Sequence, residues 1–461
     1  MLAMGPVPQL TAHQSLVFLS QLGLLLGLAL AFGRAASRFG MPALVGELSV
    51  GLLLGPSVIG HVDPGFSGWL LPQQADQFHL LDAFGQFGVV LVVGITGVQV
   101  ELRTIRRRGT TAVRVSLAGL LVPLGLGVGA GYLLADRFAP HQADGHVDST
   151  VFALFLGVAM CVSAIPVVAK TLADMDLLHR DIGQLIMSAA AVDDLVGWLL
   201  LSVVSAMATT GVRSGQLAAT LAWLAFFLLF AAVAARPLVR RLLTLAARAE
   251  GPGATIAVVV VLLLGGAVAT QSIGLEPVFG AFLVGVVIGT SGALDPVRLA
   301  PLNITVMSVL APVFFATAGL RADLTALAKP TVLAAGVGIL ALSILGKFGG
   351  AYLGARASRL ERWEALALGA GMNARGVIEV VVAMVGLRLG VLNTDTYTVI
   401  ILVAIVTSLM APPVLRLAVA RIPSTPEESF RRAFLVQGGL VEGGLADNAP
   451  VLQTAGTASG T

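Results

Sequence analysis

The stretch Ser188-Ala-Ala-Ala-Val-Asp-Asp-Leu-Val-Gly-Trp198 places two adjacent carboxylates, Asp193 and Asp194, inside a long apolar segment. A charged side chain in the middle of a membrane costs about 3 kcal/mol on insertion scales, so charges that persist there indicate a function. Neighbouring residues on a helix point about 100° apart, so one carboxylate can face a water-filled cavity while the other faces a neighbouring helix. A buried, hydrogen-bonded pair with no further role is the alternative interpretation.

The composition predicts a membrane protein. The 461 residues are 57% hydrophobic and 11% charged, with a mean hydropathy of +0.93. Soluble proteins carry about 25% charged residues, so an ordinary cytosolic enzyme, a disordered chain and a nucleic-acid-binding protein are excluded. The single cysteine, Cys161, lies in an apolar run and leaves no disulfide framework.

Hydrophobic segments of membrane-spanning length recur along the chain. A transmembrane helix needs about 20 mostly apolar residues, and that window predicts about 13 helices in an all-α polytopic membrane protein. The predicted spans are Ser15–Phe32, Pro42–Gly60, Leu80–Val100, Thr110–Ala135, Thr150–Leu172, Ile182–Thr209, Leu217–Ala235, Ala254–Thr270, Leu275–Ser291, Asn303–Gly319, Thr331–Ala355, Trp363–Leu387 and Thr396–Ala420.

The basic residues alternate between the two sides of these spans. Nineteen of them follow odd-numbered spans and five follow even-numbered spans. Because cytoplasmic loops are enriched in Lys and Arg, we expect the N-terminal segment 1–14 outside and the C-terminus in the cytoplasm of an inner membrane. The first fourteen residues carry no basic stretch, so we expect no cleaved signal peptide. Residues 421–461 are polar and glycine-rich and are predicted to form a disordered cytoplasmic tail.

One of only three lysines, Lys347, lies in the apolar run Leu340–Gly349. A buried lysine can lose its proton, whereas arginine essentially cannot, so this residue suits a titrating group. By helix geometry it lies about 7 Å from the depth of Asp194, within reach of its long side chain. The alternative is a lysine whose ammonium group snorkels to the membrane surface.

Two predicted spans carry helix-breaking residues in their middle. Pro166 interrupts the fifth span, and Gly369-Ala-Gly-Met-Asn-Ala-Arg-Gly376 brings Asn373 and Arg375 to membrane depth in the twelfth. The two spans are seven apart and therefore run in opposite directions. Paired interrupted helices in inverted halves indicate a transporter's binding site. The alternative is a proline kink with no such role, which is also common in membrane helices. Glu379 is four residues from Arg375 and can pair with it on one helix face.

Glycines alternate in Gly125-Leu-Gly-Val-Gly-Ala-Gly131. This run lies within a span rather than between a strand and a helix, so it is no nucleotide-binding fingerprint. We interpret it as a site of close helix packing.

These features favour transport chemistry. A carboxylate that binds either a proton or a cation, but not both, is what proton-for-cation exchange requires, and an adjacent pair cannot easily hold two charges. No His/Glu metal motif and no nucleophile motif stands out, so we expect no enzyme activity, no cofactor and no structural metal. Channels need filters built from several subunits, and no filter segment is evident.

From about Gln14 to Ala420, the chain resembles the monovalent cation:proton antiporter-2 family, within the sodium/proton antiporter superfamily. The matching stretches are Val45-Gly-Glu-Leu-Ser-Val-Gly-Leu-Leu-Leu-Gly-Pro-Ser-Val-Ile-Gly60, Gly280-Ala-Phe-Leu-Val-Gly285, Pro312-Val-Phe-Phe-Ala-Thr-Ala-Gly-Leu320 and Gly371-Met-Asn-Ala-Arg-Gly376. The resemblance implies two inverted-topology repeats in a membrane domain over residues 15–420. In it, helices four to six and eleven to thirteen form a core whose broken helices five and twelve cross. Helices one to three and eight to ten form a dimerisation panel, and helix seven links the two.

By the same resemblance, Asp194 is the main ligand of the cation and the proton. Asp193 pairs with Lys347, and Ser163 completes the coordination. The supporting residues at the crossing are Pro166, Asn373, Arg375 and Glu379.

The resemblance leaves the ion open. The doublet with a lysine resembles the electrogenic branch, whereas the contexts of Pro166 and Asn373-Ala-Arg375 resemble potassium and broader cation exchangers. Related potassium-efflux proteins carry a nucleotide-binding domain; with about forty residues after the last span, we expect no such regulation.

The working hypothesis is a homodimeric antiporter of the bilayer that exchanges Na⁺ or K⁺ for H⁺ and serves pH homeostasis. An exporter of an organic cation or metabolite by the same proton coupling is the main alternative, and an ion channel is a more distant one.

Overall fold

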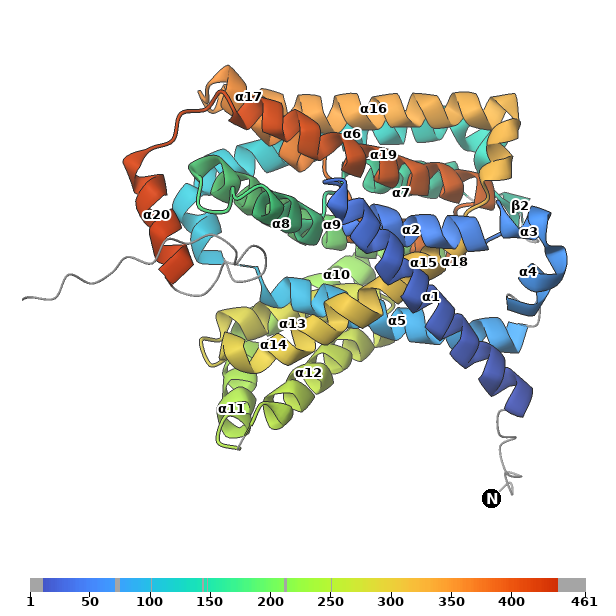
Figure 1. Ribbon diagram of the computed structural model, residues 1–461, viewed down its shortest axis with the longest axis horizontal. Coiled ribbons are helices and arrows are strands. Elements are labelled where there is room, and N and C mark those ends of the chain that lie inside the picture. Colours follow the sequence, from blue (N-terminus) through green and yellow to red (C-terminus); the bar gives the residue numbers. More distant parts are fainter. Residues whose placement is uncertain are drawn as a thin grey trace, which may run out of the picture.

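The computed structural model describes residues 11–70, 75–100, 102–142, 145–146, 148–210, 214–249 and 251–437. Within these ranges the chain is helical except for loops and one hairpin of two-residue strands, in which His141 pairs with His146 (Figure 1). The all-α fold class is therefore confirmed. The elements are α1 (Ala12–Arg38), α2 (Ala43–Leu54), α3 (Ile59–Val62), α4 (Pro64–Leu70), α5 (Ala75–Val98), α6 (Leu102–Phe138), β1 (His141–Gln142), β2 (Gly145–His146), α7 (Ser149–Cys161), α8 (Ile165–Asp174), α9 (Asp181–Thr210), α10 (Ser214–Phe230), the π-helical turn η1 (Ala231–Ala235), α11 (Arg236–Ala246), α12 (Gly253–Ser272), α13 (Pro277–Thr290), α14 (Pro296–Thr305), the π-helical turn η2 (Val306–Leu310), α15 (Ala311–Leu320), the 3₁₀-helix η3 (Leu324–Ala328), α16 (Pro330–Ala357), α17 (Arg362–Met372), α18 (Val377–Arg388), α19 (Thr394–Val419) and α20 (Pro426–Gln437).

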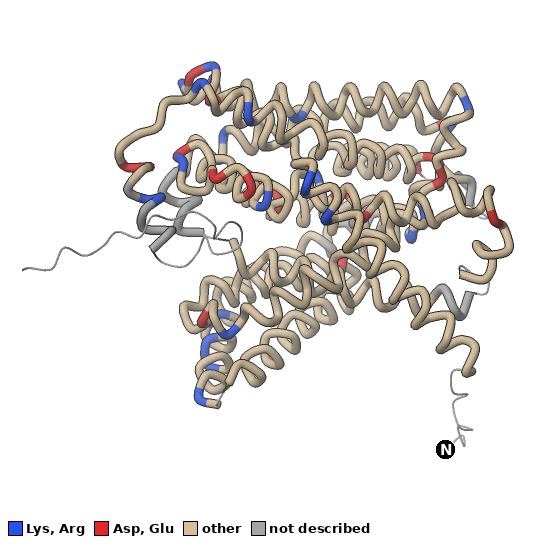
Figure 2. Tube along the Cα trace, viewed as in Figure 1, with Lys and Arg blue, Asp and Glu red and all other residues tan. Residues whose placement is uncertain are grey.

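The helices match the predicted spans. Eleven helical segments in the described residues are long and apolar enough to cross a membrane, and the bent pair α17–α18 makes a twelfth. The segment predicted over Leu275–Ser291 is α13, a shorter apolar helix of 14 residues. Every predicted span therefore falls on a helix or on a broken pair of helices. Figure 2 shows that Lys, Arg, Asp and Glu gather mainly at the helix ends and leave long stretches uncharged.

Helix ends do not always coincide with the ends of the predicted spans. Helix α2 ends at Leu54, but the apolar segment continues through α3, so the predicted span Pro42–Gly60 matches a candidate membrane span over Ala43–Val62. Helix α6 begins at Leu102, before the fourth predicted span at Thr110, so the basic stretch 103–108 belongs to the start of this helix and not to a loop. A helix can extend beyond the hydrocarbon into the polar interface, which a hydropathy window does not register.

The C-terminal segment contains a helix where the sequence predicted disorder. Thr425 and Glu428 form a reciprocal cap at the start of α20: the Thr425 amide donates to Glu428 Oε2 at 3.0 Å, and the Glu428 amide donates to Thr425 Oγ1 at 3.3 Å. This Thr-x-x-Glu pattern is a helix-start signal. The prediction of disorder is wrong for Pro426–Gln437, and its remainder, 438–461, lies outside the described residues, as does 1–10.

The helices pack in two groups. In one, α2 contacts α1 and α15, while α13 contacts α5 and α12; in the other, α6 contacts α7, α9 and α16, and α17 contacts α16 and α19. Figure 1 shows α16, α6, α7 and α19 together along the top of the view and α11 to α14 along the bottom. In the first group, Gly51 lies against Gly319, where a Cβ would meet backbone atoms of α15. Backbones approach this closely only where side chains are absent.

Candidate ion-binding site

The fifth span is broken immediately before Pro166. Helix α7 ends at Cys161, and α8 begins at Ile165. Between them Val162 and Ala164 have extended backbones, with ψ of 146° and 113°. Pro166 lies in the first turn of α8, where its missing N–H costs nothing and its fixed φ suits a helix start. The proline therefore starts the second half-helix rather than kinking a continuous one.

The second break lies directly against the first. Helices α17 and α18 are bent by 40° at residues 373–376. The Ser163 hydroxyl, whose single hydrogen is shared with a second acceptor described below, donates to the Met372 carbonyl oxygen at 2.8 Å. A Cβ on Gly376 would lie 3.2 Å from the Cβ of Ala164 and against Val167. The two broken spans therefore cross at their interruptions, which confirms the predicted crossing of broken helices.

Asp193 is held by three side chains from three different segments. Its carboxylate accepts hydrogen bonds from Ser116 Oγ of α6 at 2.5 Å and from Ser163 Oγ at 3.0 Å, and it forms an ion pair with Lys347 of α16. None of the three has more than 1% of its surface exposed. A buried charge is costly unless it is paired and hydrogen-bonded, and Asp193 meets both conditions.

Lys347 also caps the C-terminus of α7. Its ammonium group donates to the carbonyl oxygen of Cys161 at 2.5 Å. The last carbonyls of a helix have no partner within the helix and carry its negative dipole end. The side chain is fully buried, so its ammonium group does not snorkel to the membrane surface.

Asp194 has a different environment although it is the next residue. Both of its carboxylate oxygens face the amide of Ile165, at 3.3 and 3.4 Å, at the first turn of α8. A helix N-terminus attracts negative charge through its free N–H groups and its dipole. Among the described residues no Lys or Arg forms an ion pair with Asp194, and the residue is fully buried. The doublet is thus split into one compensated and one uncompensated carboxylate.

Arg375 and Glu379 complete the crossing from α18 and the loop before it. Arg375 donates to the carbonyl oxygens of Ala159 and Met160 at 2.8 and 2.6 Å and pairs with Glu379 at 3.0 Å. The predicted pairing of Arg375 with Glu379 is therefore present, and it is accompanied by contacts to the last turn of α7. Lys347 and Arg375 therefore both place a positive charge against the carbonyl groups at the C-terminal end of α7.

Asn373 caps α17 and is completely buried, yet neither its amide oxygen nor its amide nitrogen has a hydrogen-bond partner within the described residues. The second carboxylate oxygen of Glu379 is likewise without one. Buried polar atoms are nearly always paired, so these atoms are available to a polar ligand at the second break.

The structure brings the predicted site residues together and adds others. Asp193, Ser163 and Lys347 touch directly, Asp194 lies at the same break, and the second break supplies the rest. Sequence reasoning missed Ser116, whose only signal is a hydroxyl in an apolar span. The carbonyl groups of α7 carried no signal, because every residue has one.

Comparison with known proteins identifies the family. Residues 24–421 match the family described as sodium/hydrogen exchanger, transmembrane. The chain belongs to the sodium/hydrogen exchanger family. The resemblance recognised in the sequence is confirmed at this level.

Several relatives of this member of the sodium/hydrogen exchanger family are named as antiporters of a cation and H⁺. The chain is 29% identical over 402 residues to the Na⁺/H⁺ antiporter NhaS4 of Synechocystis sp., covering 86% of this chain and 96% of the relative. It is 29% identical to cation/H⁺ antiporter 19 of Arabidopsis thaliana (82% of this chain, 46% of the relative) and 26% identical to K⁺/H⁺ antiporter 1 of Saccharomyces cerevisiae (83% and 44%). It thus spans about half the length of the plant and yeast relatives.

A solved structure has the same fold. The sodium proton antiporter MjNhaP1 from Methanocaldococcus jannaschii, at pH 8, superposes with a TM-score of 0.64 at 16% identity, covering 88% of this chain and 97% of that one. At this identity the match concerns the fold alone.

Proposed function

We propose that this protein is a monovalent cation/proton antiporter that exchanges Na⁺ or K⁺ for H⁺ across the membrane. The observation that carries the proposal is the split carboxylate doublet at the crossing of two broken helices. Asp193 is compensated by Lys347, while the fully buried Asp194 has, among the described residues, only a backbone amide as partner. Its family members include proteins named Na⁺/H⁺, K⁺/H⁺ and cation/H⁺ antiporters.

In the proposed mechanism a proton and a cation compete for Asp194. A buried carboxylate without a counter-ion holds one positive partner at a time, because leaving it charged and unpaired is costly. Ser163 and the amide of Asn373, which has no hydrogen-bond partner in the part of the chain that the structure describes, supply neutral oxygen atoms of the kind that alkali cations bind. Asp193 and Lys347 keep the charge of the site balanced while Asp194 exchanges its partner.

Access to the two sides alternates as the helix group containing the crossing moves against the other group. In this assignment α6–α9 and α16–α19 form the core, α1–α5 and α12–α15 form a dimerisation panel of a homodimer, and α10–α11 link them. The packing of the helices in two groups supports this division. We place the protein in an inner membrane with its N-terminus outside. Basic residues support this orientation, because cytoplasmic loops are enriched in them. Figure 2 shows many of them near the α11–α12 turn, the α16–α17 turn and α20.

The test is proton flux in reconstituted vesicles with a pH-sensitive dye. Adding Na⁺, Li⁺ or K⁺ to vesicles with an imposed proton gradient is expected to move protons for the native chain and not for Asp194→Asn. The matched control is Asp174→Asn, the same change at a half-exposed carboxylate of α8, which retains flux. Retained flux in Asp194→Asn overturns the site.

The same assay separates the other candidate functions. Proton movement driven by an organic cation and by no alkali cation identifies an exporter. Cation flux that is unaffected by the proton gradient identifies a channel.

A further inference from the structure

The glycine run of α6 serves two different surfaces. Gly127 and Gly131 face α7, where a Cβ would lie 2.7 Å from the Cα of Gly157 or would meet Ala153. These two glycines permit close packing, as the sequence indicated. Gly125 and Gly129 alternate with them, and a Cβ at either position would meet nothing within 4 Å. Gly338 of α16 is equally open. Since glycine in a helix interior costs about 1 kcal/mol relative to alanine, packing does not account for these three.

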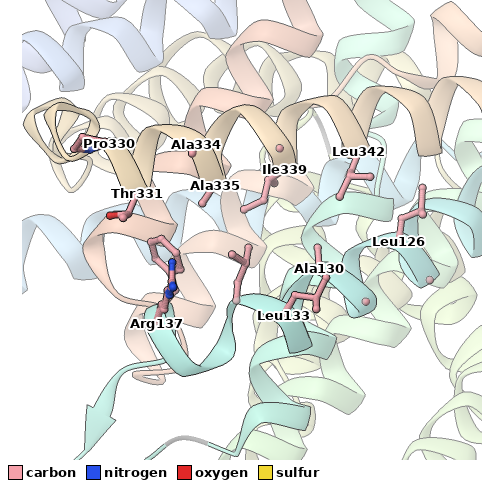
Figure 3. A pocket seen from close by; sticks show the side chains of 15 residues that line it. Leu126, Ala130, Leu133, Arg137, Pro330, Thr331, Ala334, Ala335, Ile339 and Leu342 are labelled. Carbon is pink, nitrogen blue, oxygen red and sulfur yellow. The ribbon is translucent and has the colours of Figure 1, made fainter.

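The open glycines line a groove of about 780 Å³ between α6 and α16 (Figure 3). The remaining wall is mostly aliphatic and includes Leu126, Leu133 and Ile339. Leu133 is 84% exposed, so the groove opens to the outside of the helix group rather than toward the ion-binding site. In a membrane-spanning protein the medium on this face is lipid.

One end of the groove carries a cation. Arg137, the penultimate residue of α6, borders it beside Pro330 and Thr331 at the start of α16 (Figure 3). In the part of the chain that the structure describes, Arg137 makes no ion pair and no hydrogen bond. Lys329, at the same end of α16, is already paired with Asp395 at 3.1 Å. The preceding Asp136 is exposed and points about 100° away around the helix.

The dimensions match one leaflet of a bilayer. From Gly125 to Arg137 the helix rises about 18 Å at 1.5 Å per residue. Half of a hydrocarbon core of about 30 Å is about 15 Å. Arg137 therefore lies at headgroup level when the glycines lie near the middle of the membrane.

We propose that this groove binds an anionic phospholipid, with an acyl chain against the three open glycines and the phosphate on Arg137. A soluble anion leaves the long apolar wall unexplained, and a neutral apolar molecule leaves the unpaired guanidinium unexplained. Helices α6 and α16 also supply Ser116 and Lys347 to Asp193, so the lipid lies on the same helix pair as the proposed core.

The test is native mass spectrometry of the purified full chain, titrated with phosphatidylglycerol or with phosphatidylcholine of the same acyl chains. We expect one phosphatidylglycerol to bind more tightly than phosphatidylcholine, by about fivefold or more, the value of one basic residue near a phosphate. Arg137→Gln is expected to remove this preference. Gly338→Leu, which fills the groove, is expected to remove the tight site for both lipids.

Two matched controls separate the groove from general charge and helix effects. Lys329→Gln removes the paired cation at the same helix end, and Gly349→Leu adds the same side chain at another open position of α16 that does not line the groove. Both are expected to bind lipid as the native chain does. Equal binding of the two lipids, native binding in Gly338→Leu, or an equal loss in Lys329→Gln overturns the proposal. Displacement of the lipid by soluble glycerol phosphate alone does so as well.

Discussion

Lys347 donates from α16 to the carbonyl oxygen of Cys161 at the residue where α7 stops. The same ammonium group pairs with Asp193 of α9. One buried cation therefore serves a helix end and a carboxylate at once. This arrangement connects the first broken helix to the carboxylate doublet. Lys347 therefore both stabilises the fold and balances the charge of Asp193.

Lys347→Gln is expected to destabilise the protein by about 3–5 kcal/mol, because it leaves the buried charge of Asp193 without its partner. Under the proposed function it also changes the voltage dependence of exchange more than the apparent cation affinity. Thermal unfolding in detergent and flux at imposed membrane potentials measure the two effects. The double variant Lys347→Gln/Asp193→Asn removes both charges and is expected to recover much of the lost stability. A double variant less stable than Lys347→Gln alone would contradict this account of the pair.

Arg375→Lys is expected to lower stability by about 3 kcal/mol, since hydrogen bonds to charged groups contribute about 1.5–3 kcal/mol each. The planar guanidinium reaches the carbonyl groups of Ala159 and Met160 and also Glu379. A lysine ammonium does not reproduce that fork. The measurement is the unfolding temperature, with Arg248→Lys, an exposed arginine after α11, as the control. Equal unfolding temperatures for the two variants would exclude this capping role.

The site residues that the sequence singles out are those whose chemistry conflicts with an apolar span. Asp193, Asp194, Lys347 and Arg375 stand out because each is a charge at membrane depth, and Pro166 stands out because it lacks a donor. Their partners were less visible. Ser116 is an ordinary polar residue, and the Cys161 carbonyl becomes a partner only when a segment 186 residues away folds against it.

The same reasoning explains the misread parts of the chain. The helix α20 was hidden by the glycine-rich composition that follows it, although Thr425 and Glu428 carry a capping signal. The groove was hidden because glycines that pack and glycines that leave space alternate in one run. Only the position of α7 relative to α6 distinguishes them.

The ion pair between Glu276 and Arg388 predicts an asymmetric response to substitution. It joins the start of α13 to the end of α18 at 3.0 Å, with Glu276 6% and Arg388 41% exposed. Arg388→Gln strands a nearly buried carboxylate and is expected to cost about 2 kcal/mol, reduced from the fully buried case by solvent around the arginine. Glu276→Gln strands a solvated cation and keeps the Ser205 contact, so it is expected to cost less than about 1 kcal/mol.

Unfolding temperatures of these two variants and of their double variant measure the coupling. Because the pair joins the proposed panel to the proposed core, both variants are also expected to change the flux rate of the antiporter. Equal destabilisation by the two single variants would show that burial does not set the cost.

Glu428 fastens α20 to the start of α9. It is buried, pairs with Arg180 at 2.8 Å and accepts the Asp181 amide at 2.7 Å, while Arg431 pairs with Asp181 at 2.8 Å. Glu428→Gln removes the charge from this cluster, so α20 is expected to detach more often. Cleavage by trypsin after Arg431 is then expected to be about tenfold faster, corresponding to about 1.4 kcal/mol of lost docking energy.

The control for this prediction is the neighbouring Glu427→Gln, which makes the same change at an exposed position of the same helix turn. Its cleavage rate is expected to stay close to that of the native chain, because Glu427 is exposed and contributes none of the contacts to α9 named above. A loss of favourable helix-dipole interaction is common to the two variants, so only detachment distinguishes them. Equal acceleration in both variants would therefore attribute the effect to helix fraying and would contradict the docking role of Glu428.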